Sequence, residues 1–501
     1  MGYIDTAIFL AFLFITLFVG IASSRGIRTI KHYALGHRNF STATIVATIV
    51  ATWISGSAFM TDIGGVYKDG IFWAIPIFCG DIINWLIICY LLAPRMSEFL
   101  GSISIADALG NIYGNKIRFI ASISSTFNCI GKIAAQFKVS ATVLELFFGV
   151  SSFYAILISC IIVILYSSFG GIKAVTFTDI IQFFTFGSIL PIIGLIIWGT
   201  FDDPHVVYST VSSNKIFDFS ELFNIHNPNA WSAGILFVYF CIPSINPAIF
   251  QRISMSRDTN QVSQSFFYAI ITCSIIAITF FWIGILLLAK NPSLEPSKLF
   301  GYIIDNYAYV GAKGLIAAGV MAMVMSTADS YINAASVTFS YDVSKALNMK
   351  WSESFNLKIS YLCSILIGIL AFVLAFCVQG LFGIFTMVSS FYLPIVTMPL
   401  MLAIFGFRST TKSALIGISA GFTTVLVWRM YGLDKVILST LPGSLANLTF
   451  FIGSHYLLKQ EGGWGRISNK QPLMAMKSYR KLVILEYIYA IKNFNFYRFC
   501  I

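Results

Sequence analysis

Long apolar stretches alternate with short polar segments along most of this chain. Thirteen of these stretches are predicted to be membrane-crossing helices, at residues 3–22, 41–66, 70–94, 118–147, 151–169, 178–199, 230–250, 265–289, 312–340, 358–378, 381–406, 412–429 and 436–458. Most have about 20 residues or more, enough for a helix to span a hydrocarbon core of about 30 Å. The pattern therefore predicts an all-α integral membrane protein, with a transmembrane domain at residues 1–458 and a basic tail at residues 459–501.

The basic residues are sorted between alternate loops. If the first helix runs from outside to inside, the inner loops and the tail carry 23 of the 32 Lys and Arg residues. This is the positive-inside bias of membrane proteins, and it predicts an outer N-terminus and a cytoplasmic tail in a cell (inner) membrane. We expect the first helix to be retained rather than cleaved as a signal peptide, because Met1–Asp5 carries no basic residue.

Composition and motifs exclude several classes of protein. Charged residues make up 11% of the chain and mean hydropathy is +0.82, whereas a globular domain has about 25% charged residues. The net charge of +11 lies mainly in the inner loops and the tail, where anionic lipid rather than nucleic acid attracts it. The chain has no phosphate-binding loop and no zinc-protease or serine-hydrolase motif. We expect no enzymatic activity and no cofactor.

Two of the predicted helices carry residues that interrupt a helix. The second contains Ser55-Gly56-Ser57 at its centre, and the seventh contains Pro243 and Pro247 around Asn246. Interrupted helices free backbone carbonyls at membrane depth, where transporters use them to hold cations; a kink for close packing is the alternative. The interrupted helices are the second and the seventh of the thirteen, so they occupy corresponding places in two successive groups of five helices. This predicts inverted repeats at about residues 41–199 and 230–406.

The ninth helix carries a polar face. Ser326, Asp329, Ser330 and Asn333 recur every three or four residues, with Thr327 beside them. Hydroxyl and carbonyl oxygens suit a small hard cation, although the face could also serve only to join helices. Further polar residues at membrane depth, Asp81 and Asn84 in the third helix and Lys132, Gln136 and Lys138 in the fourth, are candidates for lining a substrate cavity.

Four motifs in chain order resemble those of the sodium:solute symporter family, most closely its sodium/proline branch. They are Tyr33–Arg38, Leu165–Gln182, Asn246–Arg252 and Val324–Thr327. The resemblance covers about residues 3–458. It implies a leucine-transporter-type fold of five plus five helices, two of them discontinuous, with alternating access driven by sodium.

The resemblance also implies positions for the site. Sodium would be bound by the carbonyls of Ala51, Ile54 and Met323 and by the side chains of Ser55, Ser326 and Thr327. The substrate cavity would include Ser57, Ala58, Asp81, Asn84, Gln136, Tyr239, Pro243, Pro247 and Asn333. Trp53 stands where proline transporters have an aspartate, so this sodium site would be uncharged. Asp179 would attract the ion as it leaves toward the cytoplasm, unless it only caps a helix.

We therefore expect a sodium-coupled symporter that imports a small organic solute, and the solute class that we expect first is an amino acid such as proline. A vitamin acid or a monocarboxylate is the alternative solute. The rival function is a transporter-like sensor that works with a histidine kinase. The sequence leaves the oligomeric state open, and Tyr479–Phe499 is either an amphipathic helix on the inner leaflet or an unstructured tail.

Overall fold

The computed structural model of the protein describes residues 2–24, 26–377 and 380–464. Regular structure in this part of the chain is helical, apart from one isolated antiparallel bridge between Arg408 and Gly463. The prediction of an all-α protein is confirmed. Most of the basic tail, including Tyr479–Phe499, lies outside the described residues.

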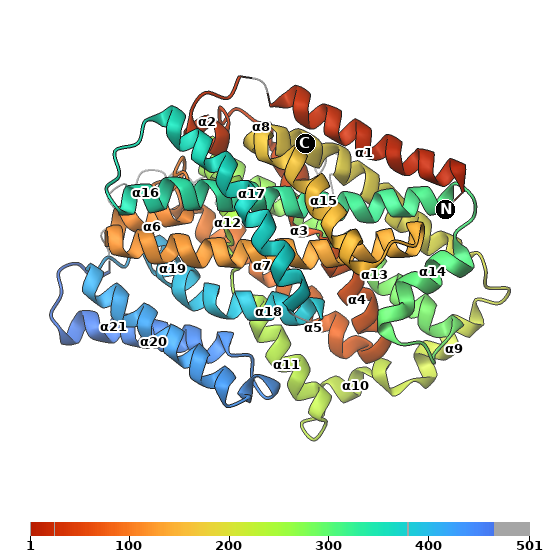
Figure 1. Cartoon of the computed structure of the whole chain (residues 1–501). Coiled ribbons are helices and arrows are strands. Elements are labelled where there is room, and N and C mark those ends of the chain that lie inside the picture. The colour runs from red at the N-terminus through yellow and green to blue at the C-terminus, as the bar shows by residue number, and fades with distance from the viewer. Residues whose placement is uncertain (1, 25, 378–379, 465–501) are drawn as a thin grey trace, which may run out of the picture.

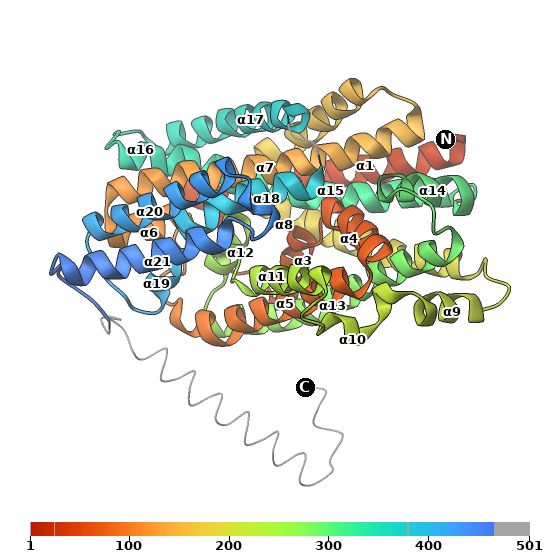
Figure 2. The same cartoon turned by 90° about the horizontal axis from the view of Figure 1, so that it is seen from below.

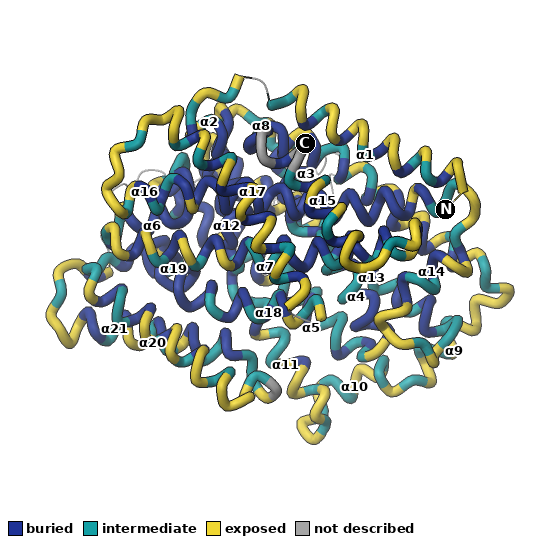
Figure 3. Tube along the Cα trace, viewed as in Figure 1, coloured by how far each residue is buried: buried dark blue, intermediate teal, exposed yellow. Residues whose placement is uncertain are grey.

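Helix α15 lies at the centre of the molecule. In its most apolar stretch 94% of the residues are buried, against 28% in α1 at the edge of the bundle. Figure 3 shows the contrast between the buried α15 and the exposed outer face of α1. The helices that pack around α15 are α1 (Tyr3–Ser23), α7 (Asn115–Phe148), α8 (Ser152–Trp198) and α17 (Glu353–Cys377), and α15 itself is Ala312–Val337.

Both predicted interruptions are present. Helices α3 (Thr42–Trp53) and α4 (Gly56–Asp69) meet at an angle of 59°. Helices α11 (Pro228–Cys241) and α12 (Pro247–Met255) are likewise separated by a non-helical segment. The two breaks lie among the central elements of the bundle in both views (Figures 1 and 2).

The remaining long helices complete the bundle. Helices α20 and α21 pack side by side at one edge (Figure 1). The long helices are α5 (Ile71–Leu86), α13 (Thr259–Lys290), α18 (Leu381–Tyr392), α20 (Thr411–Met430) and α21 (Thr440–Leu457). The short ones are α2 (Ile30–Leu35), α6 (Ile105–Tyr113), α9 (His205–Ser213), α10 (Phe219–Leu222), α14 (Leu299–Tyr307), α16 (Val343–Ala346) and α19 (Met398–Ile404). Three π-helical segments continue long helices, at Ile87–Leu92, Thr338–Asp342 and Leu393–Thr397.

One predicted loop is shorter than expected. Between the fifth and sixth predicted helices, at residues 170–177, the chain leaves helical geometry at Gly171, where the two helical parts of α8 meet at a sharp kink, and the residues after it are already helical. Gly171 has φ of 55°, and a side chain there would come within 3.0 Å of the Tyr33 carbonyl. The kink therefore depends on a residue that has no Cβ.

Several of the described helices are long and apolar enough to cross a membrane. Among the described residues, eight helices are long and apolar enough to cross a membrane, and ten if each of two bent helix pairs counts as one crossing. The protein is a multi-pass membrane protein. The count of thirteen stays a prediction.

Candidate functional site

The first break brings free backbone oxygens to the middle of the bundle. Ile54 and Ser55 have extended backbone angles, so α3 ends and its last carbonyls lack donors from a following turn. The Ser55 hydroxyl accepts a hydrogen bond from the Ala58 N–H (3.0 Å) and caps α4. A Cβ on Gly56 would lie 2.7 Å from Val324 of α15, so this glycine allows the close approach of the two elements.

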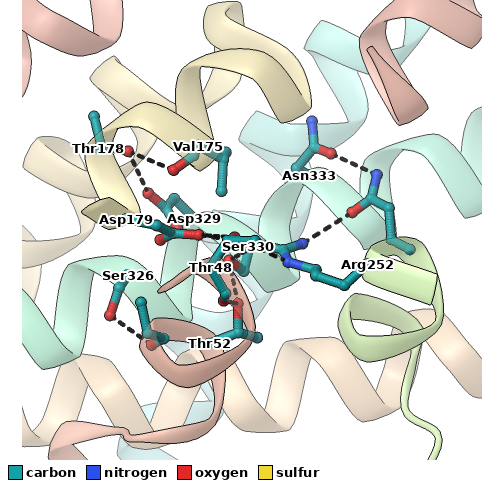
Figure 4. Close-up of polar contacts among 12 residues, drawn as sticks. Thr48, Thr52, Val175, Thr178, Asp179, Arg252, Ser326, Asp329, Ser330 and Asn333 are labelled. Carbon is teal, nitrogen blue, oxygen red and sulfur yellow. Dashed lines mark hydrogen bonds and ion pairs between the residues drawn. The ribbon is translucent and has the colours of Figure 1, made fainter. Parts of the chain in front are cut away.

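The candidate sodium ligands on α15 face the end of α3. The Ser326 hydroxyl lies 2.8 Å from the Ala51 carbonyl oxygen and 3.2 Å from that of Met323. The Thr327 hydroxyl lies 3.5 Å from the carbonyl oxygen of Thr52, which the sequence analysis did not include. Figure 4 shows Ser326 directed at the end of the α3 ribbon. This buried set of neutral oxygens is the donor type that a small hard cation prefers.

The two other predicted sodium ligands lie at the edge of this group. The Ser55 hydroxyl caps α4 and is 3.0 Å from the Ser57 hydroxyl, which in turn accepts from the Gln136 amide at 2.9 Å. Ile54 lines the adjoining cavity. The structure places these two residues beside the break. Sodium binding by any of the six predicted ligands stays a prediction.

The second break is shaped by capping and by proline. The Asn246 side chain accepts from the Ile249 N–H at 3.0 Å, and Pro247 is the first residue of α12, where its missing N–H costs nothing. Across the break, Asn84 of α5 accepts from the Ser244 N–H at 3.3 Å. These hydrogen bonds therefore stabilise the non-helical segment between α11 and α12.

A cavity of about 170 Å³ lies between the two breaks and extends along α4. Six of the nine predicted substrate residues line it: Ser57, Ala58, Asp81, Asn84, Gln136 and Tyr239. The other three do not. Pro243 and Pro247 are buried in the backbone of the second break, and Asn333 accepts a hydrogen bond from Gln251 of α12 at 2.8 Å.

The sequence analysis missed much of the cavity wall. Asp62 of α4 and Trp73 of α5 lie in it, and the Trp73 indole donates to the Asp62 carboxylate at 3.3 Å. Trp53 and Trp85 form an edge-to-face pair with ring centroids 4.8 Å apart. Asp62 carried a usable signal, since it is an ionisable residue inside a predicted membrane helix. The aromatic residues carried none, because apolar helices are rich in them.

A buried polar cluster lies on the opposite side of the first break, along α3. Asp179 of α8 and Arg252 of α12 are 3.2 Å apart and both side chains are 0% exposed. Thr48 of α3 donates to Asp179, while Arg252 donates to Ser330 of α15 at 2.5 Å (Figure 4). The cluster thus ties α3, α8, α12 and α15 together.

The cluster changes the interpretation of Asp179. The stretch of α8 that is long and apolar enough to cross a membrane begins at Gly170, not at 178 as predicted. Asp179 lies more than two turns inside this helix, so it cannot cap its N-terminus. Its partner is the Arg252 guanidinium, a pairing that the sequence analysis did not foresee.

Two discontinuous helices around a central cavity, with an oxygen site where α3 meets α15, define a leucine-transporter-type secondary transporter. The chain belongs to the sodium:solute symporter family, which matches residues 33–421. The family and the leucine-transporter-type fold that the sequence motifs implied are thereby confirmed, with sodium as the coupling ion.

The relatives are transporters named for several different solutes. The chain is 25% identical to a sodium/pantothenate symporter of Haemophilus influenzae, with 91% of this chain and 90% of the relative covered. It is 24% identical to a sodium/sialic acid symporter of Proteus mirabilis, with 86% and 90% covered. It is 23% identical to a high-affinity choline transporter of Caenorhabditis elegans, with 80% and 71% covered.

Solved structures agree on the fold. The substrate-bound, outward-open structure of a sodium-coupled sialic acid symporter superimposes with a TM-score of 0.81 at 21% identity, covering 93% of this chain and all of that one. A nucleobase-cation-symport-1 transporter in a closed conformation gives a TM-score of 0.55 at 12% identity, covering 85% and 94%. At these identities the likeness concerns the fold alone.

Proposed function

We propose that this symporter binds sodium where α3 breaks, and that the ion drives import of a small organic solute through the adjoining cavity. The observation that carries the proposal is the convergence of Ser326 with the Ala51 and Met323 carbonyls, 2.8 and 3.2 Å away. Thr327, Ser55 and the Ile54 carbonyl complete the proposed ligand set. Bound sodium would replace hydrogen bonds between the break and α15, and so couple the break to the central helix.

The same break separates the two ends of the proposed transport path. The cavity reaches Thr61 and Asp62 along α4, while the α3 side is sealed by the Asp179–Arg252 cluster. Release of sodium and solute on the α3 side requires this cluster to open. Asp179 would then lose Arg252 as its partner and attract the departing cation, which is the exit role that we assign to it.

We further propose the orientation that the charge bias predicts. The α4 side faces outward and the α3 side faces the cytoplasm of a cell whose inner membrane holds the protein. The repeats at about residues 41–199 and 230–406 then supply one discontinuous helix each. This assignment rests on the distribution of Lys and Arg, and the fold is compatible with it.

For the solute, we propose an amino acid, not necessarily proline. The family does not fix the solute, because the relatives are named for pantothenate, sialic acid and choline. Vitamin acids and monocarboxylates are therefore the alternatives in the test. A sensor that binds the solute without moving it, together with a histidine kinase, is the alternative in function.

Counterflow in proteoliposomes tests the proposal. Vesicles that contain the full-length protein are preloaded with each unlabelled compound of a panel of amino acids, vitamin acids and monocarboxylates. We expect accumulation of at least one labelled amino acid that depends on sodium. Accumulation of an acid alone would correct the solute class. Saturable solute binding without counterflow would replace the symporter by the sensor.

A further inference from the structure

Three ionisable side chains face the cavity without forming ion pairs with one another. They are Asp62 of α4, Asp81 of α5 and Lys132 of α7, each half-buried in the cavity wall. Among the described residues, the ion pairs within 4.0 Å include none of these three. Because a charge at membrane depth is costly without a partner, the missing partner is expected to be a ligand.

The contacts of these groups leave room for a ligand. The Asp62 carboxylate accepts the Trp73 indole N–H at 3.3 Å, and the buried Asp81 Oδ1 has no hydrogen-bond partner in the described part of the chain. The Lys132 ammonium lies over the Phe385 ring, 3.3 Å from its centroid. The three side chains line one and the same cavity.

The kinds of group in the wall indicate what the space binds. Two carboxyl groups and one amino group face the cavity, so the groups that accept hydrogen bonds from an amine outnumber the one that donates to an acid. Its walls are aromatic, with Trp53, Trp85 and Tyr239 among them. Aromatic faces attract ammonium groups, most strongly where water is excluded. A protonated amine therefore complements both the carboxylates and the rings.

We propose, resting on the function above, that Asp62 and Asp81 receive the protonated amine of the transported solute while Lys132 receives its acid group. The solute class is thus a small zwitterion. Asp62 and Asp81 are specificity-determining residues in this proposal, and a hydroxyl in place of the amine leaves both carboxylates unmatched. Sites that lose an expected hydrogen-bond donor discriminate strongly, because their buried polar groups stay unpaired.

Matched solute pairs test this proposal. L-alanine is compared with L-lactate and L-proline with cyclopentanecarboxylate, since the members of each pair differ mainly in the amine. Sodium-dependent currents are recorded on solid-supported membranes from proteoliposomes of the full-length protein. We expect at least a tenfold higher apparent affinity for the amine member of a pair. Equal or stronger responses to the amine-free acids overturn the proposal, and so does silence of every amine.

Variants assign the effect to the carboxylates. We expect Asp81→Asn and Asp62→Asn each to reduce the preference for the amine at least tenfold, while Asp81→Glu, which keeps the charge, retains most of it. Asp305→Asn, at an exposed carboxylate of α14 outside the cavity, is the matched control. Unchanged selectivity in both Asn variants overturns the proposal, whatever their expression.

A second readout separates this proposal from the proposed function. Sodium-dependent thermal stabilisation of the purified protein reports the ion site, whichever solute is used. Stabilisation by sodium together with currents from amine-free acids would leave the symporter intact and remove the amine site. Absence of both sodium stabilisation and sodium-dependent current would remove the proposed function as well.

Discussion

Charged residues on the two sides of the first break are treated in opposite ways. On the α3 side, Asp179 and Arg252 neutralise each other at 3.2 Å and are fully buried. On the α4 side, Asp62, Asp81 and Lys132 face a cavity without ion pairs among them. A closed seal needs charges that satisfy each other, whereas a binding site keeps charges that a ligand satisfies. These two roles account for the paired charges on one side of the break and the unpaired charges on the other.

The roles of the two sides depend on whether the α3 side or the α4 side faces the cytoplasm. Labelling of introduced cysteines decides this with an all-or-none result. In a cysteine-free background, we expect a membrane-impermeant thiol reagent added outside to modify Ser213→Cys and not Lys350→Cys. Both positions are exposed, so access is limited only by the membrane. Permeabilised cells provide the control, in which both positions should react. The reverse pattern would exchange the two sides throughout the proposed transport cycle.

Removing one partner of the sealed pair should have the largest effect on stability. Arg252→Ala leaves Asp179 buried without its counter-ion, and breaking such a pair costs about 3–5 kcal/mol. We expect low abundance and a strongly lowered unfolding temperature in detergent. Asp62→Ala, which opens no ion pair, is the contrasting variant and should be much milder.

A double variant then tests the role of the pair in transport. Asp179→Asn with Arg252→Gln removes both charges and keeps similar shapes, so stability should recover relative to Arg252→Ala. Sodium-driven uptake should nevertheless stay slow, because the exit carboxylate is gone. Normal uptake at normal abundance in the double variant would leave the pair with a purely structural role.

The oxygen site at the break should show a smaller and more selective effect. Ser326→Ala and Thr327→Ala each remove one oxygen from the proposed sodium ligands, which should cost about 1–3 kcal/mol by comparison with an unsatisfied buried group. Sodium activation of uptake should shift to higher concentrations, while solute affinity at saturating sodium changes less. Thr338→Ala is the matched control, since that hydroxyl donates to the Ala334 carbonyl of its own turn at 2.7 Å. Unchanged activation in both variants would exclude these hydroxyls.

The two breaks could be predicted from the sequence because glycine, serine and proline interrupt a helix by local effects, without any tertiary contact. The Asp179–Arg252 pair could not be predicted in this way, since the two residues are 73 positions apart and meet only because α8 and α12 both pack against α3 and α15. The loop predicted at 170–177 is longer than the break in the structure, because Lys173 and Thr176 make a helical segment appear polar. In the structure Thr176 is buried inside the bundle.

The candidate site residues likewise divide into those positioned by local sequence effects and those positioned by tertiary packing. Residues beside the breaks, such as Ser57 and Ala58, line the cavity because the break positions them, and their contact with substrate stays a prediction. Asn333 does not line the cavity, since the sequence gives its helical face but not the neighbour that covers that face. Its neighbour is Gln251 on the sealed side. Periodicity thus gives the face of a helix, and packing decides what the face meets.

A further buried carboxylate sharpens the comparison, because its partners are backbone groups. Asp5 of α1 is 1% exposed, and its Oδ1 accepts from the N–H groups of Gly311 and Gly314, at 2.8 and 2.9 Å, at the start of α15. The charge therefore meets the positive end of a helix dipole. Asp5→Asn keeps an acceptor and loses the charge, which should cost about 0.3–1 kcal/mol. Asp5→Ala loses the cap as well, at about 0.5–2 kcal/mol.

Unfolding temperature in detergent measures both Asp5 variants, and we expect Asp5→Ala to fall further than Asp5→Asn. Sodium activation should stay as in the unaltered protein, because the contact of Asp5 with the start of α15 lies about four turns away from Ser326 of the proposed sodium site. Thr6→Ala, next to Asp5 at an exposed hydrogen bond to the Gly2 carbonyl, is the control for the end of α1. Equal unfolding temperatures in Asp5→Ala and Thr6→Ala would mean that the cap contributes nothing. Altered sodium activation would instead show that the position of α15, and with it the ion site, depends on α1.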